Sequence, residues 1–252
     1  MNKSFHDRFD FNNAIVAFGV WLLVISVYSL TRAATLSFWD CGEFITASYV
    51  LGIPHPPGTP LYVMIGRIFT LLPLSSDIAV RTNLMSGFCS SIAALFAYLT
   101  SVRILRLWFG VDRSRYSRLL VYSGSAAGAL FFAFGLTNWT NSVETEVYGI
   151  AMMFMTVSLW LTMIYYENKD TILAERIMLL IVFVAFLGIG VHMTTFLILP
   201  VAALFFIIKK ESNNTTWYMM TIFFVVELYL VFILSSRPGE IPWYLPSVVV
   251  FV

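Results

Sequence analysis

The segment from Phe38 to Arg67, FWDCGEFITASYVLGIPHPPGTPLYVMIGR, concentrates ionisable side chains in a chain that has few of them. It contains two acids, Asp40 and Glu43, followed by His55. A carboxylate at the mouth of a membrane cavity can act as a general base, and the spacing of three places both acids near one helix face. The same Asp-x-x-Glu spacing fits a capping box, with Asp40 at the N-cap. Catalysis and capping are compatible for Glu43 and compete for Asp40.

A second acidic segment, NSVETEVYG, runs from Asn141 to Gly149. Asn141 and Glu144 repeat the capping spacing ahead of an apolar stretch. Glu146 does not fit a cap, since it lies deeper, among apolar residues and close to Tyr148. An acid that enters an apolar span costs free energy unless it is paired or faces water. We expect Glu146 to face a polar cavity.

Four basic side chains accompany these acids: His55, Arg67, Arg81 and His192. Each has a structural interpretation. His55 can hydrogen-bond a carbonyl that the proline-rich turn leaves free, His192 can cap a helix C-terminus, and the arginines can extend to lipid headgroups. A guanidinium or imidazolium also binds an anionic phosphate, so these residues could equally hold a phosphorylated ligand.

Long apolar stretches surround these segments. Of the 252 residues, 59% are hydrophobic and only 12% are charged, which indicates a polytopic membrane protein. A bilayer core of about 30 Å requires about 20 apolar residues per helix, and the backbone in lipid must satisfy its own hydrogen bonds, so we expect an all-α fold. Seven spans are predicted, at Asn13–Thr31, Asn83–Leu105, Leu119–Thr137, Val147–Tyr166, Arg176–Val191, Thr194–Ile208 and Trp217–Ser235.

The distribution of Lys and Arg predicts the orientation. With the N-terminus in the cytoplasm, eleven of the fifteen fall on the cytoplasmic side, as the positive-inside rule requires. The acids and basic residues named above then share the opposite side, in a first outer loop at 32–82 and a second at 138–146. The first loop is expected to form two interface helices, Gly42–Leu51 and Pro60–Leu72, hinged at GIPHPPG. We expect a bacterial inner membrane with a periplasmic site.

Other residues limit the possible functions. Cys41 and Cys89 have no metal-ligand spacing, and one lies in a loop and the other in a span, so no disulfide is expected. No protein metal ligand is assigned, and a requirement for a divalent metal stays open. Glu227, inside the seventh span, must be protonated or paired. We expect one domain over 1–252 and partners among membrane lipids but not nucleic acids.

A sugar carried on a polyprenyl phosphate suits such a site. The lipid lies in the bilayer and the sugar at the interface. Phosphate is a good leaving group and needs cations but no general acid, whereas the acceptor hydroxyl needs one base. A single displacement of this kind inverts the anomeric centre, so the two carboxylates of glycoside hydrolysis reduce to one base and a phosphate-binding group.

The motifs also resemble a known family. The stretches FWDCGEFITASYVLGIPHPPGTPLYVMIGRIFTLLP, RTNLMSGFCSSIAALFAY, WTNSVETEVYGIAMMF and GIGVHMTTFLILP resemble, in this order, protein O-mannosyltransferase-like membrane proteins. That family is similar to the GT-C superfamily of integral-membrane glycosyltransferases, which share a module of about seven membrane helices and use polyprenyl-phosphate sugars.

The resemblance implies roles for individual residues. Asp40 would be the base, with Glu43 supporting or orienting it. Glu144 and Glu146, with Tyr148 beside them, would contact the acceptor or a metal, and His192 would face the donor phosphate. The implied reaction is inverting transfer of a hexose, with mannose expected, to Ser or Thr of exported proteins. Many members of the family are longer, with a soluble C-terminal part, so we expect such a part to be missing here.

Two other functions remain open at this stage. A transporter or flippase of lipid-linked sugars would show inverted repeats, and we find none. In a non-catalytic scaffold subunit the loop acids would only cap helices. Asn caps a helix about as well as Asp but cannot take a proton, so the substitution Asp40→Asn separates chemistry from capping.

Overall fold

The computed structural model describes residues 10–56, 58–109, 114–169 and 171–207, together with positions 218, 221, 222 and 225. Every regular element in these residues is a helix. The chain divides into two compact units, Met1–Ala203 and Leu204–Val252, and the site described below lies in the first. The elements are α1 (Phe11–Thr31), α2 (Cys41–Val50), α3 (Pro60–Leu71), α4 (Ile78–Phe109), α5 (Arg115–Phe134), α6 (Leu136–Val143), α7 (Tyr148–Glu167), α8 (Ile172–Ile189), the 3-10 helix η1 (Met193–Leu197) and α9 (Ile198–Ile207).

Five of these helices are long and apolar enough to cross a membrane: α1, α4, α5, α7 and α8. The predicted all-α polytopic membrane fold is confirmed, and the first five predicted spans correspond to these helices. The sixth, expected at Thr194–Ile208, coincides with the shorter apolar helix Met193–Phe206, and residues 208–217 lie outside the described ranges. The seventh, Trp217–Ser235, and Glu227 lie outside the described ranges.

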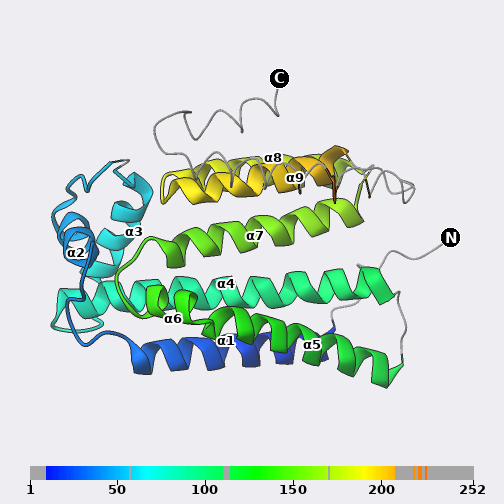
Figure 1. The fold of residues 1–252 in the computed structure, drawn as a ribbon, viewed down its shortest axis with the longest axis horizontal. Coiled ribbons are helices and arrows are strands. Elements are labelled where there is room, and N and C mark those ends of the chain that lie inside the picture. Colours follow the sequence, from blue (N-terminus) through cyan, green and yellow to red (C-terminus); the bar gives the residue numbers. More distant parts are fainter. Residues whose placement is uncertain are drawn as a thin grey trace. The chain divides into compact units, whose positions relative to one another are not determined.

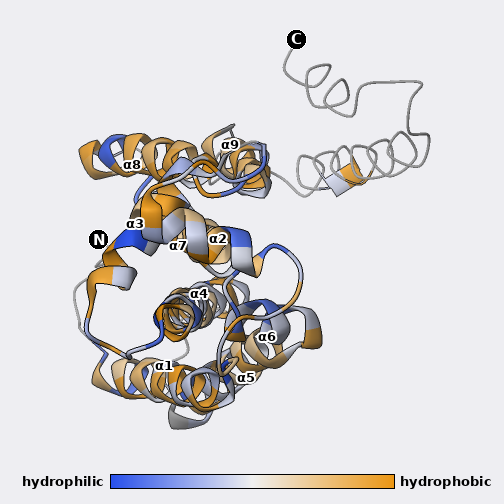
Figure 2. Cartoon of the chain, turned by 90° about the vertical axis from the view of Figure 1, so that its left-hand side faces the viewer, coloured by the Kyte–Doolittle hydropathy of each residue, from blue (hydrophilic) through white to orange (hydrophobic). Residues whose placement is uncertain are grey.

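Helix α4 is the centre of the membrane bundle. It packs against α1 and α5 on one side and α7 on the other, and α7 packs in turn against α8 (Figures 1 and 2). The contact between α4 and α7 requires a glycine, because a Cβ at Gly149 would lie 2.6 Å from Ser90 Oγ and 2.9 Å from the Ser86 carbonyl oxygen. Small residues at such crossings let membrane helices approach closely.

The first outer loop forms the two predicted helices, α2 and α3, at one end of the bundle (Figure 1). Leu51 closes α2 in a left-handed conformation, φ 56°, and Pro60 starts α3 at a position that needs no N–H donor. The rings of Phe44 and Tyr62 meet edge to face at 5.1 Å and join α2 to α3. Both rings belong to a buried cluster shared with α4 and α7, which fixes the loop on the bundle.

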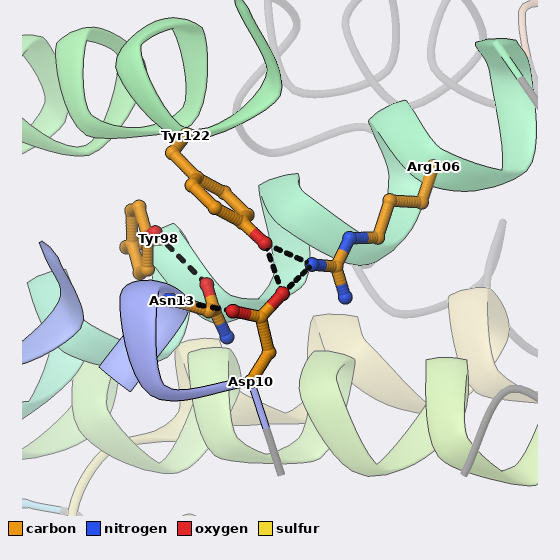
Figure 3. A network of polar contacts seen from close by, with 5 residues as sticks. All are labelled: Asp10, Asn13, Tyr98, Arg106 and Tyr122. Atoms are coloured by element: carbon orange, nitrogen blue, oxygen red, sulfur yellow. Dashed lines mark hydrogen bonds and ion pairs between the residues drawn. The ribbon is translucent and has the colours of Figure 1, made fainter. Parts of the chain in front are cut away.

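The opposite end of the bundle carries a set of polar residues that we call the polar clasp: Asp10, Asn13, Tyr98, Arg106 and Tyr122 (Figure 3). Asp10 caps α1 by accepting the N–H of Asn13. Its carboxylate also pairs with Arg106 at 3.0 Å and accepts the hydroxyl of Tyr122. Tyr98 donates to the Asn13 side chain at 2.9 Å. The clasp therefore links α1, α4 and α5 where α1 begins.

Candidate active site

A cavity of about 710 Å³ opens at the end of the bundle that carries α2 and α3. Three separate segments build it: the first outer loop, the second outer loop with the start of α7, and the turn after α8. Of the nine predicted site residues, six line the cavity: Asp40, His55, Glu144, Glu146, Tyr148 and His192. The other lining residues are Ser37, Phe38, Trp39, Phe44, Pro56, Thr59, Thr140, Asn141 and Val147.

Asp40 occupies the N-cap position of α2 but does not cap it. Its backbone is in the right-handed helical region, φ −77° and ψ −5°, and its side chain makes no capping hydrogen bond. A capping side chain ordinarily starts from an extended backbone. The capping-box interpretation of Asp40 and Glu43 is therefore wrong, and the Asp40 carboxylate is exposed at the cavity.

Glu43 binds His55 rather than the start of its own helix. One carboxylate oxygen accepts the backbone N–H of His55 at 2.6 Å, and the other lies 2.8 Å from the ring Nδ1. This hydrogen bonding lowers the pKa of Glu43 and raises the pKa of His55. Both oxygens of Glu43 thus bond to His55, and the support of Asp40 by Glu43 stays a prediction.

Glu146 lies on the cavity wall with only 8% of its surface exposed. Its Oε1 lies 3.9 Å from the thiol of Cys41, and its backbone N–H donates to Ser86 Oγ at 3.3 Å. Burial, and then the charges of Glu144 and Asp40, raise the pKa of Glu146 to about 7. Glu146 therefore lies at the cavity beside other acidic side chains.

Glu144 does not form the predicted cap with Asn141. Asn141 lies inside α6, where its side-chain amide donates to the Thr137 carbonyl at 2.7 Å, and Glu144 is the extended residue that ends α6. Helix α7 begins only at Tyr148, four residues after Glu144, so no cap can form across that gap. Glu144 is thus available to the cavity.

Asn83 on α4 holds both outer loops in place. Its amide donates to the carbonyls of Ala33 and Thr35 at 3.0 and 3.1 Å, and its oxygen accepts the hydroxyl of Thr145 at 2.6 Å. Asn83 is 1% exposed, and buried hydrogen bonds of this kind are costly to break. One side chain therefore positions the segment before Asp40 and the segment that carries Glu144 and Glu146.

His192 lies across the cavity beside Tyr148, with 5.2 Å between the ring centroids. It caps the start of η1, where Nδ1 accepts the N–H of Thr194 at 3.2 Å, and so does not cap the end of α8 as one interpretation predicted. Burial, and then the charge of His55, lower the pKa of His192. The pKa values of the two histidines of the cavity are thus shifted in opposite directions.

Arg67 and Arg81 do not line the cavity. Arg67 donates to the carbonyl of Tyr49 at 2.5 Å and lies over the Tyr49 ring. Arg81 donates to the carbonyls of Ser75 and Thr70 at 2.7 and 2.6 Å. Carbonyls at helix ends have no partner within the helix, and these guanidinium groups supply one. No lysine or arginine is found among the described residues that line the cavity.

Two groups of side chains bring their donor atoms within 4.8 Å of one another: Asp40, Glu43 and His55, and Cys41, Glu144 and Glu146. In the first group Glu43 and His55 already bond to each other. In the second, burial raises the pKa of the Cys41 thiol to about 12, which opposes the thiolate that a metal prefers. Neither arrangement by itself identifies a metal ligand. Both cysteines are free, as predicted.

Sequence reasoning missed the aromatic residues at the cavity mouth. Phe38 and Trp39 are 87% and 92% exposed and directly precede Asp40. Trp39 has a positive φ of 61°, which is costly for a bulky side chain and recurs at functional sites. The signal available in the sequence was an aromatic pair next to the proposed base, in a loop that reaches water.

Comparisons with known proteins identify relatives of this chain. A family model described as "Protein O-mannosyl-transferase TMEM260 N-terminal domain" matches residues 40–216. Protein O-mannosyl-transferase TMEM260 of Mus musculus is 31% identical over 153 residues, which are 59% of this chain and 19% of the mouse protein. Protein O-mannosyl-transferase tmem260 of Dictyostelium discoideum is 30% identical over 196 residues, 72% of this chain and 22% of that protein. No solved structure matches the chain.

These relatives are much longer than the chain, which spans about a fifth of their length. Both are eukaryotic, so they give no support to the predicted bacterial inner membrane. The family match begins at Asp40 and includes every described helix from α2 to α9. The resemblance inferred from the sequence motifs is confirmed: the chain belongs to the family of the protein O-mannosyl-transferase TMEM260 N-terminal domain.

Proposed function

We propose that this chain forms the membrane-embedded catalytic part of an inverting protein O-mannosyltransferase. The donor is a polyprenyl-phosphate mannose and the acceptor is a Ser or Thr hydroxyl of a protein. The observation that supports this most strongly is the Asp40 carboxylate, which makes no capping bond and lines a cavity with two histidines. The curated relatives of the chain are named protein O-mannosyl-transferases, which agrees with this activity.

The reaction is a single displacement. Asp40 takes the proton of the acceptor hydroxyl, the oxygen attacks C1 of the mannose, and the bond from C1 to the phosphate oxygen breaks. The polyprenyl phosphate leaves with the bonding electron pair. His55 and His192 contact its phosphate oxygens, while Glu144, Glu146 and Tyr148 contact the acceptor. Attack from the face opposite the phosphate inverts the anomeric centre.

The cavity end of the bundle faces the non-cytosolic side in this proposal. Of the nine Lys and Arg among the described residues, six lie toward the other end, where α1 begins and the polar clasp lies, as the positive-inside rule expects of a cytosolic face: Arg103, Arg106, Arg115, Arg118, Lys169 and Arg176. Phe38 and Trp39 supply an apolar wall at the water-facing mouth of the cavity, suited to one face of a hexose ring.

The test is sugar transfer by the purified protein, with labelled polyprenyl-phosphate mannose and a Ser/Thr peptide. Asp40→Asn should lower kcat/KM by at least about 100-fold, the usual contribution of a general base, and leave the melting temperature unchanged. Asp77→Ala is the matched control, because Asp77 Oδ1 accepts the N–H of Ala79 at 2.8 Å and acts as a cap. It should cost about 1 kcal/mol of stability and leave transfer intact.

Equal transfer by wild type and Asp40→Asn would rule out Asp40 as the base. A wild type that moves the intact lipid-linked sugar between leaflets without transferring mannose would identify a transporter. Product analysis adds an independent check, because a β-linked donor must yield an α-linked product.

A further inference from the structure

The charge of the cavity raises a problem for an anionic donor. Asp40, Glu144 and Glu146 line it, whereas Arg67 and Arg81 are bound to loop carbonyls elsewhere. A polyprenyl-phosphate sugar carries one negative charge on its phosphodiester. Three carboxylates would repel that charge unless a cation lies at the site. Among the described lining residues, only the two histidines can supply one.

His192 is held as a neutral imidazole. The backbone N–H of Thr194 donates to its Nδ1 at 3.2 Å, and a nitrogen that accepts a hydrogen bond carries no proton. Burial of the ring and the nearby charge of His55 also act against protonation of His192. His192 can therefore donate one hydrogen bond from Nε2 to a ligand but brings no positive charge.

His55 is protonated at Nδ1, the nitrogen that carries no proton in His192. A carboxylate can only accept, so Nδ1, 2.8 Å from Glu43 Oε2, carries a proton. Glu43 Oε1 fixes the backbone of the same residue at 2.6 Å, and the ring packs 5.6 Å from Phe44. Because Glu43 occupies Nδ1, Nε2 is the nitrogen that can meet a ligand. The hydrogen bond to Glu43 and the charges of Glu43, Asp40 and Glu146 favour the imidazolium of His55, and only desolvation opposes it.

We propose that Glu43 is a positioning residue that holds His55 as a cationic contact for the donor phosphate. This inference rests on the proposed function for the identity of the donor. It gives Glu43 a role different from orienting the base, and it explains how an acid-rich cavity accepts an anion. It also explains why Glu43 binds both the ring and the backbone N–H of His55 in the proline-rich turn.

The experiment measures donor binding without an acceptor, so that no transfer is needed. The probe is a short-chain polyprenyl-phosphate mannose, whose phosphodiester is a strong acid and keeps its single negative charge throughout the experiment. Its Kd is measured by calorimetry on the purified wild type, Glu43→Gln, His55→Gln and the double variant Glu43→Gln/His55→Arg. Glu175→Gln is the matched control, because Glu175 is also an exposed acid in the first turn of a helix but lies on α8.

Wild-type binding should weaken as the pH rises and His55 loses its proton. Glu43→Gln should weaken binding about 10-fold at pH 7.5, the loss expected for a charge-assisted contact, and recover most of the wild-type affinity at pH 5.5. The double variant should lose affinity between pH 5.5 and 7.5 only through the ionisation of Glu146, because arginine stays charged. Ionisation of Glu146 near pH 7 also weakens binding, but it does so in every variant, so the difference between the curves isolates Glu43.

Other outcomes would overturn the inference. Wild-type binding that does not depend on pH would contradict a cationic role of His55. A loss of affinity in Glu43→Gln that is equal at every pH, and that His55→Arg does not restore, would mean that Glu43 only holds the turn together. If the wild type binds the donor with the expected pH dependence but transfers nothing, the proposed catalysis fails and this inference stands. If the wild type does not bind the donor at any pH, both fail.

Discussion

The acids at the two ends of the helix bundle differ in their surroundings: one end pairs an acid with an arginine, and the other groups acids together. At the polar clasp, Asp10 is bonded to Arg106, Tyr122 and the N–H of Asn13 (Figure 3). At the cavity, Asp40 and Glu146 share their surroundings with other acids, and no lysine or arginine lines that cavity in the described part of the chain. Paired charges hold helices together, whereas unpaired buried acids cost stability and are kept where a ligand needs them.

The pKa of one acid at each end expresses this difference. Burial would raise the pKa of Asp10, but the hydrogen bonds from Tyr122 and Asn13 and the charge of Arg106 lower it overall. Burial and neighbouring acids raise the pKa of Glu146 to about 7. Ionised Asp10 thus stabilises the folded protein, and ionised Glu146 destabilises it. The ion pair of the clasp therefore stabilises the fold, whereas the cavity contains a carboxyl group, that of Glu146, which ionises less readily than usual.

Among the substitutions that test this contrast between the two ends, Glu146→Gln should have the largest effect, and it should change activity and stability in opposite directions. Loss of a carboxylate contact to the acceptor should lower kcat/KM by about 10- to 100-fold. The raised pKa means that Glu146 favours the folded state at low pH, and that this contribution is lost as the pH rises from 4.5 to about 7. At pH 8 the Gln variant should therefore be more stable than wild type, by up to roughly 3 kcal/mol.

Thermal melts of both proteins from pH 5 to 8 test this, together with transfer assays. The difference in stability should shrink as the pH is lowered. A Gln variant less stable than wild type at pH 8 would mean that Glu146 has a partner in the folded protein, and the contrast with Asp10 would fail.

A smaller effect is expected when the aromatic wall of the cavity is removed. Trp39→Gly deletes the ring and suits the positive φ of 61°, so it should fold normally and lower kcat/KM about 3- to 12-fold, the worth of an aromatic contact. Trp39→Phe should keep most of the activity. Trp108 is the control, since it is 82% exposed near the end of α4 on the clasp side, and Trp108→Ala should leave transfer unchanged. Equal losses for both tryptophans would indicate a general role in membrane anchoring.

The smallest effect on activity should follow from Asp10→Asn, which breaks the charge pairing of the clasp. We expect a loss of about 1–2 kcal/mol in the free energy of unfolding at pH 7, because hydrogen bonds to a charged group become neutral ones. The lowered pKa of Asp10 means that this difference disappears as the pH falls through that pKa. Denaturation at pH 7 and at low pH measures it. A fall in transfer of more than about twofold, in protein shown to be folded, would mean that the two ends are coupled.

The sequence by itself determined the helices. Long apolar stretches lead directly to α1, α4, α5, α7 and α8, because a backbone in lipid must form its own hydrogen bonds. Pro60 marked the start of α3 correctly, since its fixed φ suits a first helical turn. Membership of the family also followed from local motifs. Helix ends were less predictable: α4 begins at Ile78, five residues before the expected Asn83, where Asp77 caps it.

Only the tertiary structure decided which polar groups meet. The spacing of Asp40 and Glu43 was right for a cap, yet Glu43 bonds His55 twelve residues away and Asp40 makes no cap. Arg67 and Arg81 had the charge to bind phosphate, yet unpaired carbonyls at loop and helix ends hold them. Helix formation depends on residues within one or two helical turns of each other, and these residues are close together in the sequence. Hydrogen-bond partners depend on distant segments that converge, and only the folded chain brings these together.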